Sequence, residues 1–135
     1  GWVASRQIED ALYELPSLEL VVVYGLERDA LGPRLQAHLV KPDSAQVVVA
    51  TLVVSEPARY ELEPLAARVA QLRPVQRPSF IALRTQVGLT DGFRPLKTPL
   101  IAAGLEPDDP NLRAWDPESA RYCPLVELAE RRRRS

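Results

Sequence analysis

The sequence of 135 residues is poor in the side chains that most often build metal and redox sites. It has one cysteine, Cys123, and one histidine, His38, which excludes an internal disulfide and leaves no cluster with metal-ligand spacing. We therefore predict no metal site. A nucleophilic Cys–His pair would require these two residues to meet from separate segments, and two lone residues give that pairing little support.

The chain also has almost no net charge and few aromatic residues. The net charge is -1 and aromatic residues make up 6% of the chain. A protein that binds nucleic acid usually carries a basic surface, with aromatic rings where bases stack. We therefore predict no nucleic-acid partner.

Long hydrophobic runs are missing as well. The longest apolar stretches, residues 20–24 and 47–54, are far shorter than the roughly 20 residues that a membrane-spanning helix needs. No signal-peptide pattern opens the sequence. These features predict no transmembrane segment and a cytoplasmic location.

Methionine is absent, and the sequence begins Gly1-Trp2-Val3 directly before a helix signal. A content of 46% hydrophobic and 26% charged residues is typical of an ordinary soluble domain, and the length suffices for one core. We therefore expect residues 1–135 to form a single domain. Because structure is predicted to start at once, we expect this domain to be excised from a longer protein.

What is present is an alternation of helix and strand patterns. Residues 6–15 have helical apolar spacing, with Ser5 as N-cap and Pro16 as the stop. Residues 18–25 and 46–54 are β-branched apolar runs, which indicate strands buried on both faces. Apolar and polar residues alternate over residues 35–39, as in a half-exposed strand. The composition of residues 79–83 predicts a short strand. The fold class predicted is α+β, a small mixed sheet with the first two runs at its centre, flanked by helices.

Three further helices are expected. Residues 62–72 carry an apolar stripe, and Pro64 is tolerable only in the first turn of that helix. A third helix starts at Pro95 or Pro99 and ends at Gly104, before a loop at residues 107–110. The last helix covers residues 125–133.

Two cations follow a glycine turn in residues 92–101. Arg94 and Lys97 are three residues apart, so in a helix they are neighbours on one face, and Leu100 continues that row. Such a turn is able to aim positive charge at an anionic ligand. From these residues alone the alternative stays open that both are solvated cations at the start of a surface helix.

Several segments in this order resemble the small C-terminal domain of the AMP-forming acyl-CoA synthetases, of the adenylate-forming superfamily. The nearest branch is that of the very-long-chain acyl-CoA synthetases and fatty acid transport proteins, whose Thr-Gly-Thr-Phe-Lys-x-x-Lys-x-x-Leu is similar to residues 90–100 here. Each motif is weak alone, and their order carries the resemblance. The segments concerned are residues 3–12, Val23-Tyr24-Gly25-Leu26, Arg77-Pro78-Ser79-Phe80-Ile81, residues 90–100, Asp108-Asp109-Pro110 and Tyr122-Cys123-Pro124-Leu125.

The resemblance implies a mobile domain that serves two steps of a fatty-acid–CoA ligase. It implies that Arg94 occupies the position of the family's catalytic lysine, which enters the adenylation site when the domains close. It also implies that Gly25 belongs to the face that lines the path of CoA in the thioester step, and we expect Lys97 to be a further substrate-binding residue. Lys97 is the alternative catalytic cation, although it is expected to lie inside the helix start and to point away from the turn. ATP, Mg²⁺ and CoA are implied for the parent enzyme, with its N-terminal domain as partner.

A second interpretation is a non-catalytic binding or interaction domain derived from the same fold. A ligase requires a large upstream domain with a Ser/Thr/Gly-rich phosphate loop, and this chain has no such loop among its six scattered glycines. We therefore expect the isolated chain to hold no cofactor and to be inactive, and the upstream sequence to decide between the two interpretations.

Overall fold

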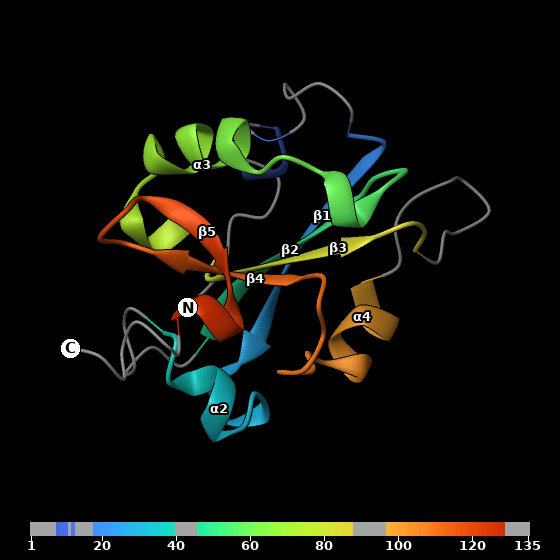
Figure 1. Cartoon of the computed structure of the whole chain (residues 1–135). Coiled ribbons are helices and arrows are strands. Elements are labelled where there is room, and N and C mark those ends of the chain that lie inside the picture. Colours follow the sequence, from blue (N-terminus) through green and yellow to red (C-terminus); the bar gives the residue numbers. More distant parts are fainter. Residues whose placement is uncertain (1–7, 11, 13–17, 40–45, 88–96, 129–135) are drawn as a thin grey trace.

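The computed structural model describes residues 8–10, 12, 18–39, 46–87 and 97–128 (Figure 1). Their centre is a five-stranded sheet in the order β1-β2-β3-β4-β5. Only the β2–β3 pair is parallel, and the other three pairs are antiparallel, so the sheet is mixed as predicted. The strands are β1 (Leu20–Glu27), β2 (Gln46–Val53), β3 (Phe80–Arg84), β4 (Leu112–Asp116) and β5 (Arg121–Pro124).

Helices cover both faces of the sheet, which gives the α+β architecture that the sequence predicts. Figure 1 shows α3 (Glu63–Ala70) on one side and α2 (Pro33–Gln36) and α4 (Lys97–Ala103) on the other. Residues 8–10 and 12 are helical, as are residues 125–128. Three 3₁₀ turns complete the described elements: η1 (Arg28–Ala30), η2 (Pro57–Arg59) and η3 (Pro74–Gln76).

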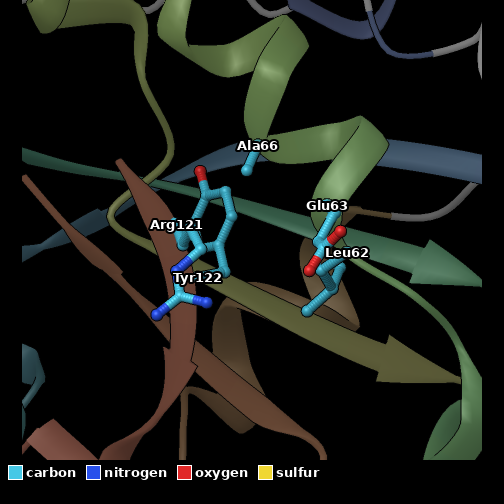
Figure 2. A pocket seen from close by; sticks show the side chains of 5 residues that line it. All are labelled: Leu62, Glu63, Ala66, Arg121 and Tyr122. Atoms are coloured by element: carbon cyan, nitrogen blue, oxygen red, sulfur yellow. The ribbon is translucent and has the colours of Figure 1, made fainter. Parts of the chain in front are cut away.

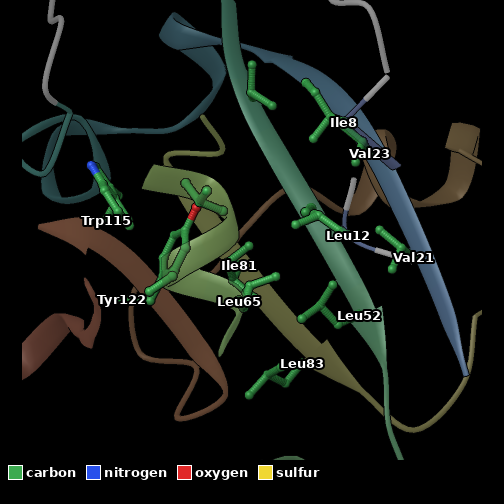
Figure 3. Close-up of a cluster of buried hydrophobic side chains, with 14 of the residues drawn as sticks. Ile8, Leu12, Val21, Val23, Leu52, Leu65, Ile81, Leu83, Trp115 and Tyr122 are labelled. Carbon is green, nitrogen blue, oxygen red and sulfur yellow. The ribbon is translucent and has the colours of Figure 1, made fainter. Parts of the chain in front are cut away.

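The first core lies between the sheet and α3, with the helix near the N-terminus packed beside it (Figure 3). Alternate residues of a strand point to opposite faces, so each strand sends every second side chain into this layer. Its largest fully buried members are Ile8, Leu12, Leu52, Leu65, Ile81 and Leu83. Because α3 supplies three buried residues from eight, its apolar stripe is what holds it on the sheet.

The second core lies on the opposite face, under α2, α4 and residues 125–128. Its buried members include Tyr24, Leu35, Phe80, Leu112 and Leu128. Leu100 of α4 is only partly buried against this cluster, and α4 contains no fully buried residue. Unlike α2 and α3, this helix therefore has no buried residue to hold it on the sheet.

One prediction about the sheet is wrong. The apolar run at residues 18–25 was expected at the centre, but β1 is an edge strand, and it extends beyond Gly25 to Glu27. Its side chains are buried on both faces because helices cover the edge above and below: Val21 and Val23 enter the first core, and Val22 enters the second. A continuous apolar run thus indicates that both faces of a strand are covered, and both faces of an edge strand can be covered too.

A second prediction, a strand at residues 35–39, is also wrong. Gly32 has a positive φ of 79°, and Pro33 follows at the first helical position, where its fixed φ suits a helix start. The amide of Gln36 donates to the carbonyl of Gly32 at 3.1 Å, closing a helical turn. Leu35 is fully buried and Leu39 packs against the same core, a spacing of four residues that also fits a helix.

The other predicted elements are present among the described residues, but α4 begins at Lys97 and not at Pro99. Pro64 lies in the first turn of α3, and Gly104 ends α4 with a φ of 64° and an amide that donates to the carbonyl of Leu100 at 3.1 Å. The rest of the predicted first helix, Pro95 and the residues after 128 lie outside the described part of the chain. Strands β4 and β5 were not predicted.

Candidate functional site

Two of the three residues that the sequence singles out, Gly25 and Lys97, lie among the described residues. Gly25 is in β1 and pairs with Val48 of β2, and Lys97 is the first residue of α4. Lys97 thus lies in the helix start, as expected. Arg94 and the turn that carries it lie outside the described residues.

Glu9 links α4 to β1. Its Oε1 atom accepts a hydrogen bond of 3.0 Å from the backbone amide of Val23 and lies 3.5 Å from Nζ of Lys97. The side chain of Glu9 is 22% exposed and that of Lys97 is 42% exposed, so water reaches the pair from one side. The sequence includes Glu9 in the segment 3–12 of the resemblance but gives it no part in a site, because no local pattern predicts a contact with residues 14 and 88 positions away.

The backbone of Gly25 faces the outer edge of β1. The amide of Val23 donates to Glu9 and not to β2, so Val23 belongs to a non-hydrogen-bonded pair of the antiparallel ladder. Residues two apart in a strand have the same orientation, so the amide and carbonyl of Gly25 point outward as well. Gly25 is half-buried and has no side chain to block an approaching group.

The side chain of Tyr24, the residue before Gly25, lies in the second core. Its hydroxyl shares a hydrogen bond of 3.2 Å with Oγ1 of Thr51, and both residues are buried. Burial raises the pKa of the Tyr24 phenol, while the hydrogen bond to Thr51 and the charge of Arg84 oppose that rise. Tyr24 therefore stays neutral in the physiological range and fixes the end of β1 against β2.

The segment after α4 is tied to the sheet by an ion pair. Nη2 of Arg84, at the end of β3, lies 2.7 Å from Oδ2 of Asp109, and these side chains are 35% and 17% exposed. Oδ1 of Asp109 accepts from the amide of Asn111 at 2.9 Å. These contacts hold the segment after α4 at the end of β3, and Leu100 packs α4 itself against the second core.

A separate cleft of about 200 Å³ opens on the other face, between the start of α3 and β5 (Figure 2). Leu62, Ala66 and the ring of Tyr122 form its apolar wall, and Glu63 and Arg121 flank it. Neither Gly25 nor Lys97 lines this cleft.

Other site types receive no support from the described residues. Among them there is no group of three or more His, Cys, Asp or Glu side chains able to hold a metal ion. His38 and Cys123 are both buried, 8% and 3% exposed. No helix in the described ranges has the length and apolarity needed to cross a membrane.

Comparison with solved structures identifies the fold. The chain is similar to a variant of the amide bond synthetase McbA from Marinactinospora thermotolerans, with 25% identity over 77% of this chain and a TM-score of 0.57. It is also similar in fold to a fatty acyl CoA synthetase from Mycobacterium tuberculosis, with 16% identity over 75% of this chain and a TM-score of 0.57. A third similar structure is the ATP-bound RpMatB-BxBclM chimera B1, at 17% identity, 75% coverage and a TM-score of 0.56.

The chain therefore has the fold of the C-terminal domain of adenylate-forming ligases. It spans only 19% of the length of the McbA variant and 18% of the other two structures. No protein-family model and no curated protein matches the sequence.

Proposed function

We propose that the chain is the mobile C-terminal domain of an AMP-forming ligase that makes an acyl-adenylate and then an acyl-CoA. The observation that carries this proposal is the similarity of fold and sequence to the McbA variant over three quarters of the chain. The ordered motifs of the sequence, from residues 3–12 to Tyr122-Cys123-Pro124-Leu125, support it independently. The same motifs favour a fatty acid as the acyl substrate.

In the adenylation step, negative charge develops on the oxygens of the carboxylate and the α-phosphate. A cation that arrives only when the two domains close stabilises that charge in the closed state alone. Arg94 is the proposed cation. Its guanidinium keeps its positive charge at any physiological pH, but it is broader than the ammonium of a lysine.

In the thioester step, the outward-facing amide and carbonyl of Gly25 are the proposed contact for the amide-rich arm of CoA. An edge strand presents just such unpaired donors and acceptors, and a glycine allows close approach. Lys97 lies near the same edge, linked to it through Glu9, and its side chain is 42% exposed. It is proposed to contact an anionic group of the substrate.

ATP and Mg²⁺ are proposed to be held by an N-terminal domain. The described residues contain no cluster of acidic side chains suited to a metal ion, and the sequence has no glycine-rich phosphate loop. The present chain then contributes the cation of Arg94 and the edge of β1. Its partner in both steps is that N-terminal domain.

One observation favours a second candidate, a non-catalytic binding or interaction domain with the same fold. Arginine stands at position 94, where the resemblance implies a lysine. At a tight site this exchange is not conservative, because the guanidinium is planar and its donors are fixed in a fork. A pseudo-enzyme would retain the fold without the lysine.

The test is carried out on the full-length protein that contains this chain. The upstream reading frame is first examined for a phosphate loop rich in Ser, Thr and Gly. Pyrophosphate exchange and CoA thioester formation are then measured with fatty acids of several lengths, for the wild type and for Arg94→Ala. The proposal predicts both activities in the wild type and loss of exchange in the variant. An upstream region without a phosphate loop, or a protein inactive with every acid, would favour the second candidate.

A further inference from the structure

The cleft between the start of α3 and β5 has walls that are fixed by contacts elsewhere. The ring of Tyr122 is held by a hydrogen bond of 2.7 Å from its hydroxyl to the carbonyl of Pro78 and by edge-to-face contact with Trp115. On the other side, Leu65 and Val69 are fully buried and hold α3 on the sheet. Both walls therefore rely on contacts outside the cleft, so the space between them needs no occupant to stay open.

The centre of the cleft is apolar and small. Leu62 is half-buried, Ala66 contributes only a methyl group, and the ring of Tyr122 closes the opposite wall (Figure 2). The volume of about 200 Å³ exceeds the roughly 150 Å³ that holds a benzene molecule, but it is below the roughly 300–1,000 Å³ of sites for drug-sized ligands and cofactors. The cleft thus has room for one large apolar side chain and not for a whole nucleotide or cofactor.

Two opposite charges flank this apolar centre. Glu63 lies on the α3 side of the cleft and Arg121 on the β5 side, and both residues are exposed. Neither side chain forms a hydrogen bond or an ion pair with another residue in the described part of the chain. Both charges are therefore available to an occupant. A complementary partner offers an apolar side chain, with a basic residue on the Glu63 side and an acidic residue on the Arg121 side.

The strength of such a contact indicates which kind of partner is able to use it. One anchor side chain and two exposed ion pairs give a dissociation constant that is about millimolar at best. A separate protein at a lower concentration would leave the cleft mostly empty if it bound through this cleft alone. A segment of the same polypeptide has an effective concentration of the order of millimolar, because a linker holds it nearby. The weak contact therefore suits a tethered partner.

We propose that the cleft is a docking site for a segment of the N-terminal domain of the same polypeptide, whose apolar side chain enters between Ala66 and Tyr122. The basic and acidic neighbours of that side chain contact Glu63 and Arg121. This inference rests on the proposed function, which supplies the N-terminal domain. Because β5 is at the edge of the sheet opposite β1, a domain that docks here contacts a different surface from that of Gly25.

The first test uses the full-length protein, with the photo-crosslinking amino acid p-benzoylphenylalanine in place of Ala67. Ala67 is exposed on α3 four residues after Glu63, so the two are neighbours on the helix surface, and this replacement leaves both charges of the cleft intact. We expect a crosslink within one polypeptide, to an N-terminal segment in which an apolar residue has an acidic and a basic neighbour. Ala58, exposed in η2 and not part of the cleft lining, is the matched control position and is expected to give no crosslink to that segment.

The second test measures the yield of the Ala67 crosslink after removal of each charge. Arg121→Gln and Glu63→Gln should each lower the yield about two- to fivefold, as expected for the loss of one exposed ion pair. Both side chains are exposed, so neither change is expected to unfold the chain. Arg73→Gln and Glu106→Gln remove exposed charges outside the cleft lining and should leave the yield unchanged. Equal losses in these controls would show that net charge governs the contact, and the docking proposal would be wrong.

The products of the crosslinking identify the occupant. Absence of a crosslink from Ala67, or a crosslink to an N-terminal segment without the expected charged neighbours, would overturn the docking proposal. A crosslink to a second copy of the chain would also overturn it and would assign the cleft to an interface between copies.

Pyrophosphate exchange by the same protein preparation tests the proposed function separately. If exchange is present and the Ala67 crosslink is absent, only the docking proposal fails. If the upstream sequence contains no N-terminal ligase domain, the proposed function fails, and the docking proposal fails with it.

Discussion

The guanidinium of Arg77 lies over the ring of Trp115, with its central carbon 5.9 Å from the ring centroid. Its Nε also donates to the carbonyls of Val69 and Leu72 at 3.2 and 3.1 Å, and Nη2 donates to the carbonyl of Ala70 at 2.9 Å. One side chain thus satisfies the last carbonyls of α3 and joins that helix to β4. Arg77 belongs to the Arg-Pro segment of the resemblance, and its contacts are structural.

Replacement of Arg77 is therefore expected to loosen α3 from the sheet. Arg77→Ala should lower the free energy of unfolding by about 1–2 kcal/mol, because carbonyls at the end of α3, two of them in part-buried hydrogen bonds, lose a charged donor. Arg77→Lys should cost less, since it keeps the charge but not the fork of donors. Urea denaturation measures both. Arg73→Ala, at an exposed arginine nearby, is the control and should change stability by no more than about 0.5 kcal/mol.

Tyr122 connects the β4–β5 hairpin to the segment before β3. Its hydroxyl donates to the carbonyl of Pro78 at 2.7 Å, and its ring meets that of Trp115 edge to face at 5.0 Å. Burial raises the pKa of the Tyr122 phenol well above its usual 10.0, with the charge of Arg77 acting weakly against it. The folded state therefore holds this proton more tightly than the unfolded chain.

The stability of the chain should consequently fall as pH rises above about 10. Because the folded pKa is the higher one, the stabilisation is complete below the unfolded pKa of about 10 and is lost as pH increases beyond it. Tyr122→Phe should be less stable than the wild type at pH 8 by about 1–3 kcal/mol, since the Pro78 carbonyl loses its donor. It should lose less stability between pH 10 and 11 than the wild type. If the free energy of unfolding fell equally with pH in the two proteins, this account would be contradicted.

The sequence predicts the parts of the fold where one physical signal dominates. The runs in β1 and β2 are apolar on both faces, and the stripe of α3 has helical spacing, so these elements follow from composition and period. The order of the strands in the sheet cannot be predicted in this way. A strand covered by helices on both faces has the same apolar sequence at the edge of a sheet as at its centre. The strands β4 and β5 are only five and four residues long and contain Arg113, Asp116 and Pro124, so their local pattern is too weak to detect.

The candidate site is predictable only in part, for a related reason. The sequence singles out Arg94, Lys97 and Gly25 because each belongs to a motif of neighbouring residues. Glu9 is not found as part of the site, since its partners Val23 and Lys97 are distant in sequence and meet it only in the folded chain. Contacts of this kind arise from tertiary packing, which no local pattern records.

Substitution of a core valine by aspartate should unfold the chain or nearly so. Val22 and Val49 are fully buried in the second core, and an unpaired carboxylate there loses its hydration without gaining a partner. Val22→Asp and Val49→Asp should each abolish the cooperative thermal transition. Val126→Asp is the control, because Val126 is 69% exposed. A wild-type melting curve for either core variant would disprove the assignment of these strands to the core.

The isolated chain is expected neither to bind ATP measurably nor to make acyl-CoA. Tight binding of a nucleoside triphosphate usually needs the backbone amides of a glycine-rich loop around the phosphates, and no such pattern occurs in this sequence. Calorimetric titration of the 135-residue chain with ATP and Mg²⁺ should give no saturable heat. Micromolar affinity would reveal a nucleotide site within this chain itself.

The catalytic assignment leads to a prediction about Arg94 in the full-length protein. A residue before a proline favours an extended backbone, so the sequence predicts that Pro95 limits the direction of the Arg94 side chain. If its charge stabilises the developing adenylate, Arg94→Ala should lower pyrophosphate exchange by about a hundredfold, the size of effect seen when one charge-stabilising donor is removed. Arg94→Lys should keep or raise the rate, because an ammonium on a thin stem fits a tight site that the broader guanidinium enters less well.

Lys97 is the matched comparison, since it is the other cation of the same turn and helix start. Its ammonium lies 3.5 Å from the carboxylate of Glu9, a contact that a lysine entering a distant active site would have to give up. Lys97→Met should therefore lower exchange by only about two- to fivefold, the size expected for a partly exposed ion pair. A loss of about a hundredfold in Lys97→Met, with Arg94→Ala close to the wild type, would transfer the catalytic role from Arg94 to Lys97. Such a result would also mean that the Glu9 contact opens before each adenylation, because one ammonium cannot serve both sites at once.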